Sequence, residues 1–289
     1  MQVRNLIVGA LLFSCTGHVN AQSLTLRVDN IDQIVDSMTL EEKVNLLVGR
    51  NDYLFGGYEK LDKAPRVMDS SISGFTQVIP RLGIPATGLA DGPAGAVVVT
   101  RPDSKKNYYA TGFPIGSLLA CSWNTGLVET IGQAIGNEIL EYGVDVVLAP
   151  GMNIHRSPLC GRNYEYFSED PVLTGKIAAA YIRGVQSNGV GACPKHFAVN
   201  SQETNRTEVN EIVSQRALRE IYLKGFEIAV KESHPWTIMS SYNRLNGPYT
   251  QENYELLTTV LRDEWGVRRY RNERLDSASQ HCCPDTCRQ

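Results

Sequence analysis

The sequence predicts an α/β protein built on parallel strands, and two patterns in its 289 residues support this prediction. Short apolar runs alternate with longer segments in which apolar residues recur at helical spacing. Strands that alternate with helices in this way pair in parallel. Polar residues follow each apolar run, and both a (β/α) barrel and a doubly wound open sheet gather such residues at the carboxyl ends of their strands.

Four strands are expected, over residues 86–90, 144–148, 190–193 and 236–240. The polar groups that follow them are Asp91, the loop 151–170, Lys195 with His196, and Tyr242. No glycine-rich phosphate loop follows the first strand, which argues against a nucleotide site. Eight strands would close a barrel, so the four expected strands predict an incomplete one.

Capping residues mark the helices between these strands. Thr39 and Glu42 form a capping box before the first helix. Asp170 followed by Pro171 predicts the start of a helix that ends near residue 188, and Ser214 caps a later one. Two of the helices are amphipathic, and their recurring apolar residues are Leu127, Ile131, Ile135 and Ile139 in one (124–142) and Leu218, Ile221, Phe226 and Val230 in the other.

The first 21 residues have the features of an export signal. Arg4 supplies a positive charge, residues 6–15 form a short apolar run, and Ala21 ends a small-residue cleavage site. The apolar run is too short to span a bilayer. We therefore expect a periplasmic or secreted protein. A lipid anchor at Cys15 is the weaker alternative, because Phe13 fits a lipoprotein cleavage box poorly.

The composition limits the possible partners. Hydrophobic residues make up 42% of the chain, charged residues 20%, and the net charge is −3, values typical of a globular protein without a basic surface for nucleic acid or anionic membrane. His281 and the cysteines beside it, Cys282, Cys283 and Cys287, could suggest a metal cluster. Structural zinc sites use two separated ligand pairs, so we expect no metal. Three scattered cysteines, Cys121, Cys160 and Cys193, are expected to be packing residues.

The loop over residues 151–170 is rich in hydrogen-bonding groups. Arginine, asparagine, aspartate and histidine beside aromatic rings suit a sugar, which presents hydroxyls at its edges and C–H faces for stacking. A loop of this kind can equally use its polar groups to satisfy its own backbone. Composition alone leaves these two interpretations open.

Five motifs in a fixed order resemble those of glycoside hydrolase family 3, the β-glucosidase family, across residues 24–266. They are Ala90-Asp91-Gly92-Pro93-Ala94-Gly95, residues 161–171, Lys195-His196-Phe197, Gln202-Glu203-Thr204-Asn205 and Ser240-Ser241-Tyr242-Asn243. The resemblance implies a (β/α) barrel of the TIM type followed by a second α/β domain. It also implies retaining hydrolysis of terminal non-reducing β-D-glucosyl residues, from a β-glucoside or a short β-linked oligosaccharide, without a cofactor.

The resemblance assigns expected roles to five residues. Asp91 should accept hydrogen bonds from sugar hydroxyls deep in the pocket, because charge-assisted bonds are strong and directional. Arg162, Lys195 and His196 should hold the neighbouring hydroxyls. Tyr242 should lie beside the anomeric centre, and holding the sugar correctly is itself a large part of catalysis.

The chain departs from the family pattern near the first motif. Relatives often carry arginine where this chain has Val97, so either Arg101 substitutes for it or the sugar preference differs. Arg206 and Arg216 are further candidate donors. The N-acetylhexosaminidase branch, which has Pro-Gly-His after Lys-His-Phe, is disfavoured because residues 198–200 are Ala, Val and Asn.

The pattern of the sequence changes at Gly266, where a helix expected over 251–265 ends. A buried strand should follow, but residues 267–274 are V-R-R-Y-R-N-E-R, and burying four arginines would be very costly. The resemblance places the nucleophile, the aspartate of a Ser-Asp-Trp-like motif, on this strand and the acid in the second domain. Neither motif is present, and Asp276 lacks the motif, so we assign no catalytic carboxylate and expect these residues to be inactive.

A shift of reading frame would explain the change. Codons allowed for residues 268–276, CGA CGG TAT CGT AAT GAG CGA CTG GAT, give D-G-I-V-M-S-D-W when read one base later, which is an apolar strand followed by the nucleophile motif. We therefore divide the chain into a signal peptide (1–21), a partial family 3 barrel domain (22–266) and an aberrant tail (267–289). A non-catalytic sugar-binding remnant is the alternative function.

Overall fold

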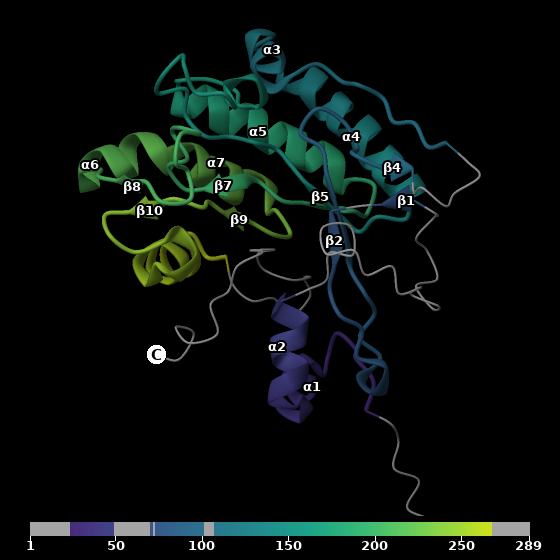
Figure 1. The fold of residues 1–289 in the computed structure, drawn as a ribbon. Coiled ribbons are helices and arrows are strands. Elements are labelled where there is room, and N and C mark those ends of the chain that lie inside the picture. The colour runs from purple at the N-terminus through teal and green to yellow at the C-terminus, as the bar shows by residue number, and fades with distance from the viewer. Residues whose placement is uncertain (1–23, 49–69, 72, 101–106, 268–289) are drawn as a thin grey trace, which may run out of the picture.

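The computed structural model describes residues 24–48, 70–71, 73–100 and 107–267. Its parallel strands lie beneath a layer of helices, and two N-terminal helices lie apart from that layer (Figure 1). The expected signal peptide, the residue Arg101 and the cysteine-rich tail with Asp276 lie outside the described residues. In the described part of the chain, no helix is long and apolar enough to cross a membrane.

The strands follow one another in sequence order. A four-stranded sheet has the order β2 (Gly74–Phe75), β3 (Gly88–Asp91), β5 (Val146–Leu148) and β6 (Gly191–Ala192), with β2 antiparallel to β3 and the other pairs parallel. β7 (Lys195–Phe197) runs parallel to β9 (Met239–Ser240). A parallel bridge between Gly151 and Lys195 links β7 to the segment after β5. The prediction of parallel strands that alternate with helices is confirmed.

The observed strands are shorter than expected, and three site residues lie within strands rather than after them. Asp91 is the last residue of β3 rather than the first residue after it. Lys195 and His196, expected to follow a strand, lie within β7, because the backbone resumes strand pairing after Pro194. Two short strands without a clear sequence pattern, β8 (Asn210–Glu211) and β10 (Arg244–Leu245), form a separate parallel pair.

The helices with caps predicted at Asp170 and Ser214 begin where expected, and α4 has a cap that the sequence analysis did not name. The Asn124 side chain accepts the Leu127 N–H at the start of α4 (Thr125–Glu141). Asp170 Oδ1 accepts two backbone N–H groups at the start of α5 (Pro171–Gln186). Ser214 caps α6 (Gln215–Ala217). A π-helical turn (Leu218–Tyr222) then leads into α7 (Lys224–Ser233), and a second wide helix of this type spans Glu255–Glu264.

Two of the apolar residues expected in the core are exposed. Leu127 is 47% exposed, because a four-residue spacing drifts by about 40° per step around a helix of 3.6 residues per turn. Val128, Ile135 and Ile139 form the buried face of α4 instead. Ile221 is 40% exposed and lies in the π-helical turn, which shifts the residues after it around the helix axis.

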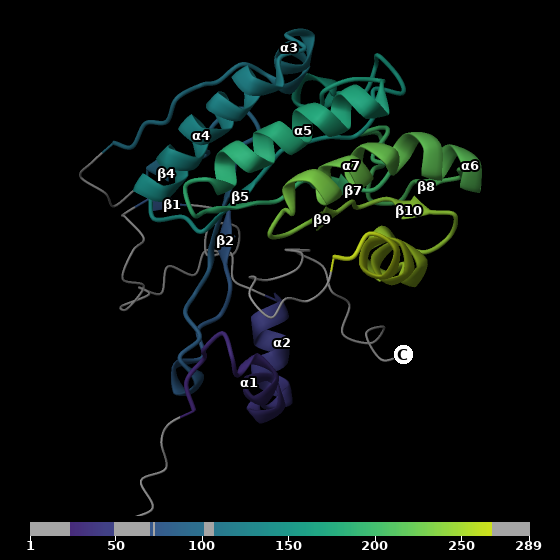
Figure 2. The ribbon, with the colours of Figure 1, turned by 180° about the vertical axis from the view of Figure 1, so that it is seen from behind.

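Close packing of α4 against α5 forms the centre of the main core. A Cβ atom added to Gly184 would lie 2.1 Å from the Glu129 carbonyl oxygen, and one added to Gly132 would lie 2.5 Å from the Tyr181 carbonyl oxygen. Only glycine allows this approach. α5 also packs against α7, so the three helices form one layer over the strands, as Figure 2 shows from behind. Cys160 and Cys193 are buried as expected, whereas Cys121 is exposed.

The remaining elements are short. Thr39 and Glu42 form the expected capping box at α2, with backbone-to-side-chain bonds of 2.8 and 3.2 Å. A small separate core of Ile34, Met38, Ile79 and Leu82 packs the N-terminal helices against a turn before β3. The elements not yet given are α1 (Ile31–Ser37), α2 (Leu40–Val48), α3 (Gly116–Cys121), β1 (Ser70–Ser71) and β4 (Val99–Thr100), of which the last two are antiparallel.

Candidate functional site

An ion pair joins the ends of two strands at the proposed site. The buried Lys195 ammonium on β7 donates to Oδ1 of Asp91 at the end of β3. The Gly92 N–H donates to the same oxygen at 3.1 Å. The turn after Asp91 needs glycine, since Gly92 has φ of +154° and an added Cβ would lie 2.1 Å from the Gly95 carbonyl oxygen. The Asp91 side chain keeps 48% of its surface exposed, so it can still accept hydrogen bonds from a ligand.

His196 is buried and held on two sides. The Asn153 side chain receives the His196 N–H at 2.9 Å and donates to the His196 carbonyl at 2.9 Å. The ring Nδ1 lies 3.1 Å from the Tyr166 hydroxyl. Burial lowers the pKa of His196 well below 6.5, and the nearby Arg162, Lys195 and Arg206 lower it further. The imidazole is therefore neutral and firmly oriented at neutral pH.

Arg162 reaches the same region from the polar loop. Its Nε donates to Oε1 of Glu165, a carboxylate that is 5% exposed. Burial alone would lower the pKa of Arg162, but the neighbouring Tyr166 and Glu165 outweigh it and raise this pKa above its ordinary value. Burial also raises the pKa of Tyr166, so its hydroxyl stays protonated. The loop thus delivers a charged guanidinium and a neutral phenol to the site.

Glu203 connects two parts of the site. Its Oε2 accepts from Arg206 at 2.8 Å, and its Oε1 accepts from Asn200 Nδ2 at 3.0 Å. Asn200 also donates to the Tyr166 hydroxyl at 2.9 Å. The Arg206 guanidinium lies over the Tyr242 ring, 5.2 Å from its centroid, which is the geometry of a cation–π contact.

The structure brings all six candidate residues into one network. Asp91 joins through Lys195, and Tyr242 joins through Arg206, while Arg162, Lys195 and Arg206 all lie close enough to depress the pKa of His196. The later candidate Arg216 is not part of it, because it pairs with Glu220 on an exposed helix face. Val97 is exposed, and its N–H donates to the Asp91 carbonyl at 2.8 Å.

Sequence reasoning missed the residues that support this network. These supporting residues are Asn153, Tyr166, Asn200 and Glu203. Asn153 and Asn200 carry no signal beyond their place in polar segments, whereas Tyr166 and Glu203 stand in the motifs 161–171 and 202–205, which could have drawn attention to them. Most of these residues occupy the loop 151–170 or the segment after β7, so the loop serves the site as well as its own backbone.

The network can bind a neutral ligand with many hydroxyls. It offers an exposed carboxylate edge beside several cationic or amide donors, which form charge-assisted hydrogen bonds with hydroxyl groups. The carboxylates Asp91, Glu165 and Glu203 are each already paired with a cation. Among the residues that the structure describes, no group of three or more His, Cys, Asp or Glu side chains is placed to hold a metal ion.

The fold and site define an α/β protein in which charged and hydrogen-bonding side chains from the parallel strands and the loops after them form one network. The Glycosyl hydrolase family 3 N terminal domain matches residues 66–268 of this sequence. The chain therefore belongs to glycosyl hydrolase family 3, and the resemblance inferred from its motifs is confirmed.

Known members of the family are similar to it in sequence and structure. "Thermostable beta-glucosidase B" of Acetivibrio thermocellus is 46% identical over 241 residues, 82% of this chain and 29% of that protein. "Exo-alpha-(1->6)-L-arabinopyranosidase" of Bifidobacterium longum is 44% identical over 237 residues, 80% of this chain and 28% of that protein. The solved structure of β-glucosidase 3B from Thermotoga neapolitana with α-D-glucose matches with 55% identity and a TM-score of 0.76, covering 82% of this chain and 32% of that one. The chain thus spans about a third of the length of these relatives.

Proposed function

We propose that this chain carries the sugar-holding half of the active site of a retaining, exo-acting β-glucosidase. The observation that carries the proposal is the network that joins Asp91, Lys195 and His196 to Arg162 and Arg206 at the carboxyl ends of parallel strands. In this proposal Asp91 accepts bonds from two sugar hydroxyls, and Lys195, His196 and Arg162 hold their neighbours. The β-glucosidase names of its relatives support the choice of sugar.

Tyr242 is proposed to lie beside the anomeric carbon. Its ring is fixed from one side by Arg206, which Glu203 holds in turn. A ring held in this way restricts the rotation of a bound sugar, and such restriction can supply several kcal/mol of a catalytic barrier. The family resemblance implies an arginine where this chain has Val97, so the calorimetry compares two sugars in order to test the sugar preference.

The proposed architecture is an incomplete (β/α) barrel over residues 22–266, preceded by a signal peptide over 1–21 and followed by the out-of-frame segment 267–289. The parallel strands in sequence order support it. The proposal also includes export to the periplasm or the medium, with lipid anchoring at Cys15 as the lesser alternative. Mass spectrometry of the exported protein tests this, since cleavage before Gln22 is expected.

The 289 residues by themselves are proposed to bind sugar without hydrolysing it. Retaining hydrolysis needs a carboxylate nucleophile and a carboxylic acid roughly 5 Å apart, and the three carboxylates of the described network are engaged with cations. The alternative is a sugar-binding remnant with no catalytic counterpart, and it predicts the same binding. Resequencing the DNA past codon 266 distinguishes a β-glucosidase that has lost its reading frame from such a remnant. Codons that cannot give D-G-I-V-M-S-D-W in the second frame would refute the lost β-glucosidase.

Calorimetry tests the binding function directly. Glucose and L-arabinopyranose are titrated into the 289-residue protein, since relatives are named for activity on each of these sugars. Saturable binding of glucose that is lost in Asp91→Ala supports the proposal. A folded protein that binds neither sugar would refute it, and turnover of an aryl β-glucoside at an ordinary enzymatic rate would refute the loss of hydrolysis.

A further inference from the structure

The hydroxyl of Tyr166 lies between two polar side chains of the network. It accepts a hydrogen bond from Asn200 Nδ2 at 2.9 Å, and it lies 3.1 Å from Nδ1 of His196. Tyr166 is fully buried, and the described residues offer its hydroxyl no other hydrogen-bond partner. Since the hydroxyl already accepts from Asn200, the acceptor left for its own proton is Nδ1 of His196.

This assignment depends on the direction of the Asn200 amide, whose oxygen and nitrogen are distinguished by their partners. Asn200 Nδ2 also donates to Oε1 of Glu203 at 3.0 Å, so both of its protons are used. Turning the amide over would place its oxygen against a carboxylate, which only accepts hydrogen bonds. Arg206 holds the other oxygen of Glu203 at 2.8 Å, so the carboxylate that orients the amide is itself fixed.

The direction of these bonds reaches the ring of His196. Burial holds the pKa of His196 well below 6.5, and a neutral imidazole carries its single N–H proton on either Nδ1 or Nε2. With the proton on Nδ1, the Tyr166 hydroxyl would accept from both sides, and its own proton would stay buried without an acceptor, which is costly. The other neighbour of Nδ1 is Asn153 Oδ1, which is farther away, at 3.4 Å, and already accepts the His196 backbone N–H at 2.9 Å. These contacts favour the proton on Nε2.

Nε2 is the ring nitrogen that is available to a ligand. It has no hydrogen-bond partner among the described residues. The charged groups that lie near enough to lower the pKa of His196, Arg162, Lys195 and Arg206, are all cations. A ligand atom that meets a protonated Nε2 must accept a hydrogen bond. A hydroxyl can accept one while it gives its own proton to a carboxylate such as Asp91, whereas a protonated amine cannot.

We propose that Tyr166 is a positioning residue whose hydroxyl donates to Nδ1 of His196 and so holds the imidazole in the tautomer that carries its proton on Nε2. Glu203 sets the direction of this chain of hydrogen bonds through Asn200. His196 then meets a ligand as a donor and selects a hydroxyl over an ammonium group. The tautomer is a property of the protein without ligand, whereas donation from Nε2 to a sugar rests on the proposed function.

Long-range ¹H–¹⁵N correlation spectra test the tautomer without any ligand. The 289-residue chain is labelled with ¹⁵N-histidine and observed at pH 7, and the His196 signals are those that His196→Asn lacks. Nε2 is expected to carry the proton and Nδ1 to be unprotonated. A proton on Nδ1, or an even mixture of the two tautomers, overturns the proposal.

Tyr166→Phe removes the hydroxyl and keeps the ring. Nδ1 then has Asn153 Oδ1, an acceptor, as its remaining neighbour, so a substantial share of the protein should carry the proton on Nδ1. Tyr181→Phe is the matched control, because Tyr181 is equally buried and its hydroxyl donates to backbone carbonyls instead. It should keep the wild-type pattern. A wild-type pattern in Tyr166→Phe overturns the role of Tyr166.

A second variant covers the case in which Tyr166→Phe does not fold. Asn200→Ala removes the donor that makes the hydroxyl give its proton to His196, so the hydroxyl becomes free to accept from Nδ1. The two tautomers of His196 should then mix. An unchanged Nε2 proton in Asn200→Ala overturns the proposed direction of the chain.

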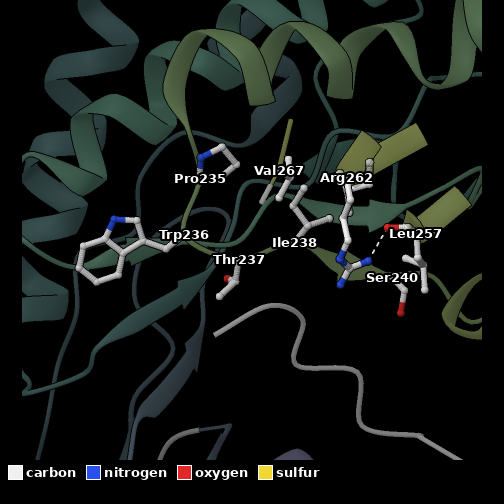
Figure 3. A pocket seen from close by; sticks show the side chains of 9 residues that line it. Pro235, Trp236, Thr237, Ile238, Ser240, Leu257, Arg262 and Val267 are labelled. Carbon is white, nitrogen blue, oxygen red and sulfur yellow. Dashed lines mark hydrogen bonds between the residues drawn. The ribbon is translucent and has the colours of Figure 1, made fainter. Parts of the chain in front are cut away.

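Calorimetry with glucose separates this proposal from the sugar site itself. Tyr166→Phe should bind glucose roughly tenfold more weakly than the wild type, and equal affinities overturn the role of Nε2 in binding. A wild type that binds no glucose refutes the proposed function and leaves the tautomer to the spectra. The mostly apolar pocket in Figure 3, which Ile238 and Leu257 line, supplies the control. A folded Leu257→Lys variant should bind glucose as the wild type does, and loss of binding would place the sugar in that pocket and overturn donation from His196.

Discussion

The Lys195 ammonium is almost fully buried, with 3% of its side chain exposed, whereas the Asp91 carboxylate that it contacts is 48% exposed. The two partners therefore depend on each other unequally. Without Asp91, a buried cation loses the charged partner that the structure gives it, and such a group cannot be left uncompensated at low cost. Without Lys195, water can still solvate the carboxylate.

This asymmetry predicts different costs for the two single substitutions. Asp91→Ala should lower the free energy of unfolding by about 2 kcal/mol or more, and Lys195→Met by less than about 1 kcal/mol. Urea denaturation followed by circular dichroism measures both. The double variant should be more stable than Asp91→Ala alone, because it removes the stranded charge. Equal costs, or a larger cost for Lys195→Met, would contradict this reading of the pair.

Glu203 is expected to act as a positioning residue for the proposed sugar site. It fixes Arg206 at 2.8 Å, and Arg206 in turn lies over Tyr242. Glu203→Gln removes the charge that holds the guanidinium, so glucose binding should weaken roughly tenfold, the cost of a charge-assisted hydrogen bond. Calorimetry measures the change. The matched control is Glu208→Gln at an exposed position nearby, and a similar loss in the control would sink the prediction.

The burial of His196 should make the free energy of unfolding depend on pH. Its folded pKa lies well below 6.5, mainly because it is buried, so the folded state stays neutral while the unfolded state binds a proton below about pH 6.5. The contribution of neutral His196 to the free energy of unfolding is therefore fully present above about pH 6.5 and is lost as the pH falls below it. The free energy of unfolding then decreases by up to about 1.4 kcal/mol per pH unit until the pH reaches the folded pKa.

The comparison that isolates this effect is His196→Asn. From pH 7 to pH 5 the wild type should lose about 2 kcal/mol more unfolding free energy than this variant, measured by urea denaturation at each pH. His234→Asn, at an exposed histidine, should keep the wild-type profile. Parallel curves for the wild type and His196→Asn would show that His196 titrates alike in both states.

The sequence predicts the local order of this fold well, because its signals are local. The caps predicted at Asp170 and Ser214 act within one helical turn, and each of these helices begins where its cap predicts. Strand length depends instead on long-range pairing, which explains why the segment 190–193 gives only Gly191–Ala192, and why Lys195 and His196 lie in a second strand. The exposure of Ile221 follows from a π-helical turn, for which the apolar spacing gives no warning.

In the candidate site too, some features follow from the sequence and others depend on long-range contacts. The charged groups that point toward a ligand, such as Asp91 and Arg162, follow from motifs that carry the family resemblance. The contacts of their supporting residues do not follow from these motifs, because Asn153 holds His196 across 43 residues of sequence, and Tyr166 contacts the same residue across 30. Contacts between segments so far apart are set by the tertiary fold and leave no spacing pattern in the chain.

Two glycine substitutions, one at the contact between α4 and α5 and one away from it, should change the stability of the protein in opposite directions. A Cβ at Gly184 would lie 2.1 Å from the Glu129 carbonyl oxygen, where the neighbour is backbone and cannot swing aside. Gly184→Ala should therefore force the helices apart and cost about 2 kcal/mol or more. Gly126 is exposed in α4, and its added Cβ would meet only the Asn124 side chain at 3.5 Å. Gly126→Ala should gain roughly 0.5–1 kcal/mol from helix propensity. Thermal unfolding of both variants checks the signs, and a stabilised Gly184→Ala would show that α4 and α5 pack less closely than this structure has them.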